Sequence, residues 1–261
     1  PLLRFFHPNR RESPEGMDFL TKEYKRIYAE LAEISGTVIS SASLSRSIDL
    51  YNEHRRWMRK FTEEAPYHPS IITPRLRHAV VKSSYFMDKA RHVVLLKDLV
   101  AGLESQPQES GGKRVVVSGI MIEPEGLLDL FAELGIVIAA DDLAQESRPF
   151  RVDVPEQGEP LERLARQWAA MGNCSLIFDP GKARMRMLED TISRLRADGL
   201  IVLMMKFCDP EEMDYPFLKQ AMDSAGVPHL KLDIEPQMQL EQARTRLQSF
   251  VEILNKKRVR G

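Results

Sequence analysis

The residue best placed for chemistry is Cys208, which lies within residues 206–212 (KFCDPEE). An apolar run ends just before this segment and a helical pattern begins just after it. A helix N-terminus stabilises anions, and it therefore favours the thiolate form of a cysteine. A thiolate in such a place is a candidate metal ligand or nucleophile, whereas most free cysteines are small buried apolar residues. Position alone leaves both interpretations open.

The second cysteine, Cys174, follows an amphipathic helical pattern and has no CxxC spacing to Cys208. Two cysteines exclude a disulfide scaffold. They also cannot complete a zinc or iron–sulfur site by themselves, because such sites need three or four protein ligands. We interpret Cys174 as a small packing residue. The six histidines are scattered without a metal-binding pairing, so a histidine-held metal is not indicated.

Polar residues gather at 141–148 (DDLAQESR), directly after a short apolar run. We predict that Asp142 caps a helix, which is the commoner use of such a residue. A catalytic carboxylate pair with Asp141 is the alternative, and the spacing alone does not support it. Residues 119–123 (GIMIE) lack the further glycines of a dinucleotide fingerprint, so a nicotinamide site is not expected.

The second half of the chain alternates strand and helix patterns. Strands are predicted at 114–119, 136–140, 200–206 and 229–235, and helices at 124–134, 160–171, 182–197 and 239–254. Strands that are apolar throughout indicate a parallel sheet covered on both sides. Ligands of such sheets bind at the carboxyl ends of the strands. Those ends carry residues 118–119, 141–142, 207–209 and 233–235, and we expect any chemistry among them.

The first hundred residues show helical periodicity instead, with helices predicted at 18–34, 43–61 and 74–103. The stretch 104–112 (ESQPQESGG) has the composition of a linker. We therefore predict an α/β protein, in which a helical region at 1–110 precedes a three-layer α/β domain with a parallel sheet at 111–261. The cysteine of interest belongs to the second region.

The composition excludes several classes of protein. The 261 residues are 43% hydrophobic and 29% charged, as in globular proteins. Lysine and arginine number 37 against 38 aspartate and glutamate, so the net charge of −1 favours neither nucleic acid nor a membrane surface. No run of about 18 apolar residues could span a bilayer. Free thiols persist in the cytoplasm, and we predict that location.

Five segments resemble one known family, that of the 2-hydroxyacyl-CoA dehydratases and benzoyl-CoA reductases. The segments are 204–212 (MMKFCDPEE), 214–216 (DYP), 141–148 (DDLAQESR), 242–250 (QARTRLQSF) and 47–53 (SIDLYNE). The word KFCDPEE is a specific motif, and the resemblance runs nearly from end to end. It is nearest to the smaller, β-type subunit of the 2-hydroxyglutaryl-CoA dehydratase D-component type.

The resemblance implies a lyase that works as a heterodimer with a related larger subunit. Each subunit of this family carries a four-iron, four-sulfur (4Fe-4S) cluster held by three cysteines, the last of which matches Cys208. A separate ATP-hydrolysing iron–sulfur activator delivers one electron. The electron turns the thioester of the 2-hydroxyacyl-CoA substrate into a ketyl radical, which expels the 2-hydroxyl group and yields an enoyl-CoA.

The sequence departs from the family pattern in its cluster ligands. The first two ligand cysteines of the family lie upstream of the segment matching residues 7–10, and Cys174 is not among the family's ligands. Because the chain begins at Pro1, we expect it to be a piece of a polypeptide with about a hundred further N-terminal residues, two of them cysteines. The alternatives are a benzoyl-CoA reductase subunit that dearomatises a ring, and a cluster-free structural subunit.

Overall fold

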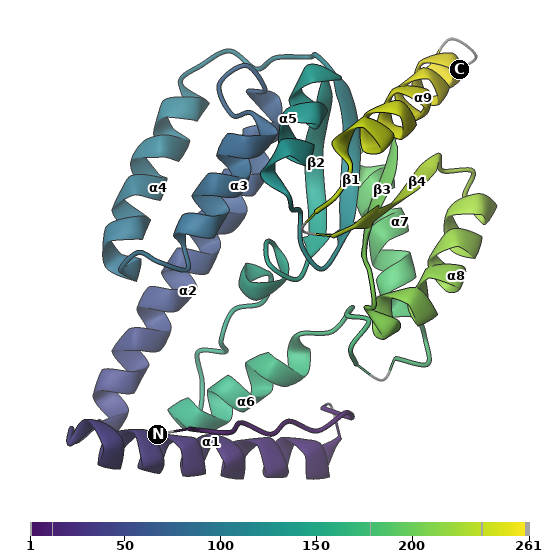
Figure 1. Ribbon diagram of the computed structural model, residues 1–261. Coiled ribbons are helices and arrows are strands. Elements are labelled where there is room, and N and C mark those ends of the chain that lie inside the picture. Colours follow the sequence, from purple (N-terminus) through teal and green to yellow (C-terminus); the bar gives the residue numbers. More distant parts are fainter. Residues whose placement is uncertain (1, 12, 178, 236, 259–261) are drawn as a thin grey trace.

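A part made of helices precedes a four-stranded parallel sheet in the computed structural model (Figure 1). The structure describes residues 2–11, 13–177, 179–235 and 237–258. Pro1, on which the expectation of a longer polypeptide rests, lies outside the described residues.

Four α-helices build the N-terminal part. They are α1 (Pro14–Ser35), α2 (Ser41–Glu64), α3 (Pro74–Ser83) and α4 (Lys89–Glu104), with a short 3-10 helix, η1 (Ala65–Tyr67), after α2. Each α-helix begins after a side chain that accepts a backbone hydrogen bond of its first turn, which satisfies N–H groups that have no partner within the helix. These caps are Ser13, Ser40, Thr73 and Asp88. The helices predicted at 18–34 and 43–61 are thus confirmed.

The third predicted helix, 74–103, is wrong as a single element, because the chain breaks it after Ser83. The Ser83 hydroxyl donates to the carbonyl of Val80, and the chain turns through residues 84–87. The Asp88 carboxylate then accepts from the backbone N–H of Arg91 and starts α4. Serine and aspartate bond to nearby backbone in this way and compete with a continuous helix.

The helical part has an apolar core of its own between α2, α3 and α4. Its buried members are Met58, Phe61, Ala65, Ile72, Val81, Leu96, Val100, Leu103 and Phe150. Phe150 comes from η2 (Arg148–Phe150), a short 3-10 helix beyond the second strand of the sheet. The second half of the chain therefore contributes to the helical core.

The sheet contains β1 (Lys113–Gly119), β2 (Ile136–Leu143), β3 (Gly199–Met205) and β4 (His229–Ile234). Their order is β2-β1-β3-β4, and every pair is parallel. All four carboxyl ends consequently lie at one edge. At that edge Gly119 passes so close to β3 that a Cβ atom would stand 2.3 Å from the carbonyl oxygen of Leu203, which only glycine avoids.

Helices cover both faces of the sheet, as predicted. On one face α5 (Glu125–Glu133) and α9 (Leu240–Arg258) pack on residues such as Val115, Val117 and Ile201. On the other face α7 (Ala183–Leu195) and α8 (Asp209–Ser224) pack on Val116, Val202 and Met204. Neighbouring residues of a strand point to opposite faces, so an all-apolar strand needs both layers.

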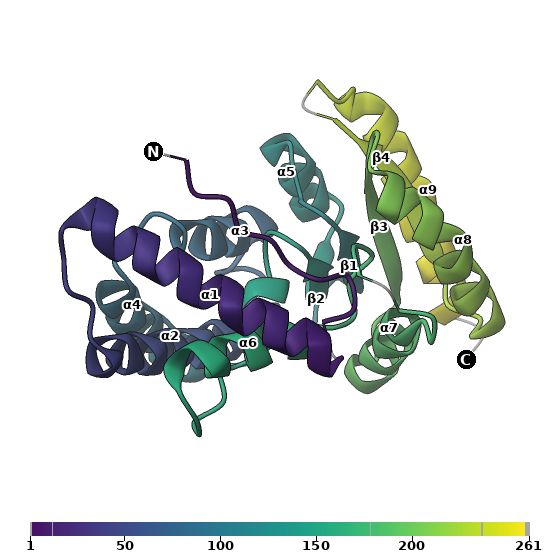
Figure 2. The same ribbon diagram turned by 90° about the horizontal axis from the view of Figure 1, so that it is seen from below.

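The two parts of the chain are joined by specific contacts. Helix α6 (Pro160–Ala170), from the second half, packs along α1, which crosses beneath the molecule (Figure 2). The side-chain amide of Asn52 on α2 both donates to and accepts from the backbone of Val154, at 2.8 Å each. No helix within the described part of the chain is both long and apolar enough to cross a bilayer.

Candidate metal-ligand site and the arginine network beside it

Cys208 lies at the carboxyl edge of the sheet, three residues past the end of β3, as predicted. It is the residue immediately before α8, and its backbone N–H donates to the carbonyl of Met205 at 3.2 Å. Its side chain makes no capping hydrogen bond to the helix. The thiol is half-buried, and therefore stands at the rim of the protein outside the apolar clusters described above.

The residue before the thiol has an unusual backbone. Phe207 has a φ of 65°, the left-handed region that costs a bulky residue about 1–2 kcal/mol. Its side chain is 93% exposed and recovers none of this energy by burial. Such conformations persist when surrounding structure imposes them, and they gather at functional sites. The turn therefore serves to bring Cys208 to the head of α8.

The first turns of α8 are acidic, and two of their carboxylates point inward. Glu211 and Asp214 are buried, whereas Asp209 and Glu212 are exposed. Negative charge at a helix N-terminus is favourable. Buried carboxylates also need direct partners, however, since an unpaired buried charge is costly. Arginines of the neighbouring elements supply those partners.

The arginines converge on Asp142, which is 1% exposed at the end of β2. Its carboxylate accepts from Arg184 at 2.8 Å, from Arg151 at 2.9 Å and from Arg148 at 3.1 Å. Burial opposes ionisation of Asp142, but the three guanidinium groups outweigh it and lower its pKa to about 2. Asp142 is therefore a fixed anion at neutral pH.

This arrangement corrects our prediction for Asp142. The strand continues through it to Leu143, so no helix begins there and the residue is not an N-cap. Its neighbour Asp141 accepts from the backbone N–H groups of Leu143 and Ser147 and pairs with the buried Arg77. Both carboxylates are held by cations and amides. Because both are engaged in structural contacts, the geometry does not support the catalytic alternative.

Arg184 ties this network to two carboxylates of α8, beside Arg148, which lies 3.5 Å from Glu211, and our sequence analysis did not single Arg184 out. It is 2% exposed on α7 and donates to Asp142, Glu211, Asp214 and the hydroxyl of Ser118. These partners lie on β2, α8 and β1. A signal was present in the sequence, because position 184 shares a helix face with the buried positions 188 and 192. A charge on an apolar stripe indicates a buried ion pair.

Cys174 lies between an arginine and a largely apolar cavity. A side-chain nitrogen of Arg148 is 3.6 Å from its sulfur, and its thiol is half-buried at a cavity of about 270 Å³ that Trp168 also lines. The next residue, Ser175, donates to Glu211 at 2.6 Å. Cys174 therefore borders the arginine network on one side and the cavity on the other, and its interpretation as a small packing residue stays a prediction.

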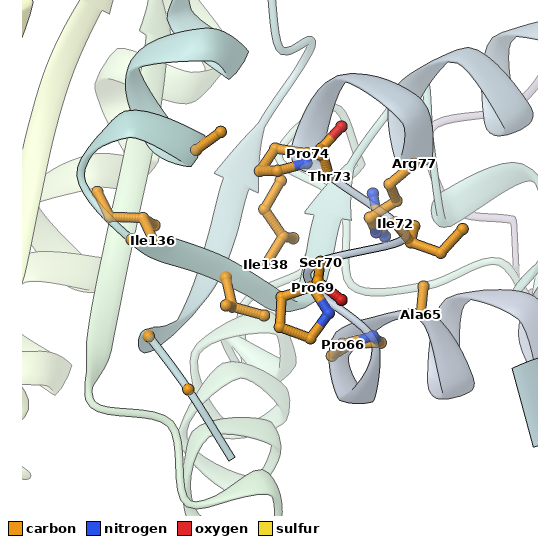
Figure 3. Close-up of a pocket in the computed structure, with 15 residues that line it drawn as sticks. Ala65, Pro66, Pro69, Ser70, Ile72, Thr73, Pro74, Arg77, Ile136 and Ile138 are labelled. Carbon is orange, nitrogen blue, oxygen red and sulfur yellow. The ribbon is translucent and has the colours of Figure 1, made fainter. Parts of the chain in front are cut away.

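The pocket drawn in Figure 3 has none of this chemistry. It is a cavity of about 390 Å³ beside the amino-terminal half of β2, lined mainly by apolar side chains such as Ile136, Ile138 and Pro74. Its one charged lining residue, Arg77, already pairs with Asp141 and Glu146. The arginines and carboxylates around Asp142 lie elsewhere, at the carboxyl ends of the strands.

The described residues contain no group of three or more histidine, cysteine, aspartate or glutamate side chains arranged to hold a metal ion. Cys208 nevertheless has the properties of a single ligand. Its sulfur is half-buried, free of a disulfide and placed directly before the first turn of a helix. The residues present thus fit one of the ligands of a metal cluster.

Known proteins resemble this chain over nearly all of its length. The sequence profile described as "2-hydroxyglutaryl-CoA dehydratase, D-component" matches residues 1–254. The β subunit of lactoyl-CoA dehydratase from Anaerotignum propionicum is 45% identical over 97% of this chain and 69% of its own length. The β subunit of (R)-phenyllactyl-CoA dehydratase from Clostridium sporogenes is 41% identical, over 95% and 66%.

A third relative is the β subunit of (R)-2-hydroxyglutaryl-CoA dehydratase from Acidaminococcus fermentans. It is 36% identical over 97% of this chain and 69% of its own length. The chain thus spans about two thirds of each relative. The resemblance first seen in residues 204–212 is confirmed, as is its closeness to β subunits. The chain belongs to the 2-hydroxyglutaryl-CoA dehydratase D-component family.

Proposed function

We propose that this chain is part of the β-type subunit of a 2-hydroxyacyl-CoA dehydratase, a lyase that removes water from a 2-hydroxyacyl thioester. The observation that carries the proposal is the place of Cys208 in the structure. A half-buried thiol stands at the head of α8, at the edge of the sheet where ligands of parallel α/β proteins bind. The same segment carries the family motif KFCDPEE.

The chain's own task is to supply one ligand of a 4Fe-4S cluster. When bound, such a cluster would supply one-electron transfer. Cys208 would hold the cluster through its sulfur, and the remaining ligands would come from outside the described residues.

Exposed apolar side chains near Cys208 support the proposal that a partner protein binds at this surface. Phe207 precedes α8, Met213 lies in its second turn and Phe217 near its middle, and all three are exposed. Met213 and Phe217 are four residues apart and share one face of the helix, and exposed apolar surface marks places that another protein covers. We assign this surface to the assembled enzyme, in which the related larger subunit excludes water from the cluster, and a separate ATP-dependent iron–sulfur activator provides the electron.

The substrate class is proposed from the relatives. Their names state lactoyl-CoA, (R)-phenyllactyl-CoA and (R)-2-hydroxyglutaryl-CoA, which share the 2-hydroxyacyl thioester and differ in the acyl side chain. We therefore propose a 2-hydroxyacyl-CoA as substrate, with the thioester as the group that accepts the electron. Two free thiols accord with the predicted cytoplasmic location.

The test compares two cysteine variants in the intact, reconstituted heterodimer. Cys208→Ser should abolish enoyl-CoA formation and lower the iron content, because serine is a poor substitute for a thiolate ligand. Cys174→Ala should change neither by much and serves as the matched control. Full activity and full iron in Cys208→Ser would exclude the ligand assignment and favour the cluster-free structural subunit.

The same preparation separates the dehydratase from its rival within the family. It should convert a 2-hydroxyacyl-CoA to the enoyl-CoA when the activator and ATP are present. Formation of a dienoyl-CoA from benzoyl-CoA, without dehydration of any 2-hydroxyacyl-CoA, would instead identify a benzoyl-CoA reductase subunit. The products differ in mass and absorbance, so one chromatographic assay decides between them.

A further inference from the structure

Arg184 is placed to control the start of α8. Two of its four partners, Glu211 and Asp214, lie three and six residues after Cys208, both at 3.1 Å. The other two, Ser118 at 2.9 Å and Asp142 at 2.8 Å, lie on the carboxyl ends of β1 and β2. A single side chain thus connects the helix that follows Cys208 with two strands of the sheet.

The interactions that α8 makes with its own flanking residues stabilise its first turn only weakly. Cys208 makes no side-chain cap, and Phe207 adopts a left-handed conformation that its own steric preferences oppose. The first turn of a helix has N–H groups without helical partners and frays readily. Contacts from outside the helix must therefore determine where its first turn lies.

The contacts from Arg184 are the central ones of this kind. Glu211 also accepts from Ser175 at 2.6 Å, and Asp214 from Lys182 at 2.8 Å. Both of these donors precede α7, and Arg148, which binds Asp142, also lies 3.5 Å from Glu211. Among the described residues, Arg184 is the side chain that bridges the two carboxylates to each other and to the ends of both β1 and β2. Burial lowers the pKa of Arg184, but Asp142 and Glu211 outweigh this effect and raise it, so the side chain stays charged.

We propose that Arg184 is the positioning residue for Cys208: its guanidinium holds the first turns of α8 against the ends of β1 and β2 and so sets where the thiolate stands. The ligand role of Cys208 comes from the proposed function, whereas the holding of α8 does not depend on it. Replacing Arg184 by an uncharged residue releases the first turn of α8 and moves the thiolate relative to any metal that it binds.

The experiment uses the full-length protein, with and without cluster, and four variants. Arg184→Gln removes the charge, and Arg184→Lys keeps the charge with fewer donors. Arg186→Gln is the matched control, since Arg186 is an exposed arginine on the same helix. Asp214→Asn weakens one partner on α8 and leaves Arg184 in place.

Two measurements that do not depend on activity report how firmly the first turns of α8 are held and how the cluster is surrounded. The first is hydrogen exchange of the amides of residues 212–215, relative to those of α4 as an internal reference. The second is the electron paramagnetic resonance spectrum of the reduced cluster. A general loss of stability would speed exchange in both helices, whereas loss of positioning speeds it in α8 alone.

We expect at least tenfold faster exchange at residues 212–215 in Arg184→Gln, with a changed spectrum. Arg184→Lys should recover most of the protection, and Arg186→Gln should match the wild type. Exchange within twofold of the wild type and an unchanged spectrum in Arg184→Gln would overturn the proposal. Should that variant not fold, Asp214→Asn decides: about threefold faster exchange in α8 supports the proposal, and wild-type exchange overturns it.

The two proposals can fail separately. If Cys208→Ser keeps the cluster, the ligand assignment is wrong, but faster exchange in cluster-free Arg184→Gln still establishes that Arg184 positions α8. If Cys208→Ser loses the cluster while Arg184→Gln behaves as the wild type in both measurements, the ligand assignment stands and the positioning role is excluded.

Discussion

A buried pair of histidines makes the stability of this protein depend on pH. His54 on α2 is 6% exposed, and its Nε2 atom lies 2.8 Å from Nδ1 of His92 on α4. Burial, the ammonium group of Lys89, His92 and the guanidinium of Arg55 all lower the pKa of His54, from 6.5 to about 4. Between these two pKa values, His54 is protonated in the unfolded chain and neutral in the folded protein.

The sign and size of the effect follow from this difference. Above pH 6.5 the side chain is neutral in both states and contributes no pH dependence. As the pH falls from 6.5 towards 4, the unfolded chain binds the proton first, so the folded state loses stability. At pH 5 the loss from His54 alone is about 2 kcal/mol, and the loss stops growing below about pH 4.

The perturbation is His54→Gln, which cannot take up a proton yet can still hydrogen-bond to His92. Urea unfolding at pH 7 and pH 5, at constant ionic strength, gives the change in the free energy of unfolding for each protein. The wild type should lose about 2 kcal/mol more than the variant between these pH values. Lys89→Met should fall between them, because it removes one of the causes of the low pKa.

Carboxylates also titrate in this range, but they are common to the wild type and to His54→Gln and cancel in the comparison. Equal losses in the two proteins would refute the reasoning, since His54 would then bind its proton equally in the folded and unfolded states. A different slope against urea between the variants would mean that the unfolded states differ, and the comparison would be repeated by calorimetry.

Two further predictions concern stability elsewhere in the molecule. Arg77→Met should lower the free energy of unfolding by about 3–5 kcal/mol, measured in urea, because it leaves buried Asp141 and Glu146 without the Arg77 guanidinium. Arg75→Met is the control, since its partners Glu125 and Asp129 are exposed, and it should unfold near the wild-type urea midpoint. Phe207→Asn should stabilise the chain by about 1 kcal/mol, since asparagine tolerates the left-handed region, and should weaken binding of the larger subunit. Phe86→Asn, at an exposed residue outside that region, should give no such gain, and a gain of equal size there would contradict the backbone explanation.

Much of the fold could be predicted from local pattern. Residues 200–205 are apolar at every position, which is typical of a parallel strand covered on both faces, and the strand predicted at 200–206 matches β3 to within a residue. Apolar residues at intervals of three and four marked α1 and α2 in the same way. These signals are local, because a strand or helix exposes its periodicity over a few residues. The break between α3 and α4 was missed, since serine is tolerated in helices and ends one only where packing favours the turn.

The place of Cys208 was also determined by the sequence. An apolar strand followed by Cys-Asp-Pro requires a strand end and a helix start, because proline suits the first turn of a helix. The surroundings of that cysteine were decided by tertiary structure alone. Asp142 and Arg184 are 42 residues apart, and nothing in either segment indicates that they meet. The pairing depends on strand order, which brings β1 between β2 and β3 and so places the ends of three strands beside one helix. A buried charge is stable only where such an arrangement delivers its partner, and that is a property of the folded chain as a whole.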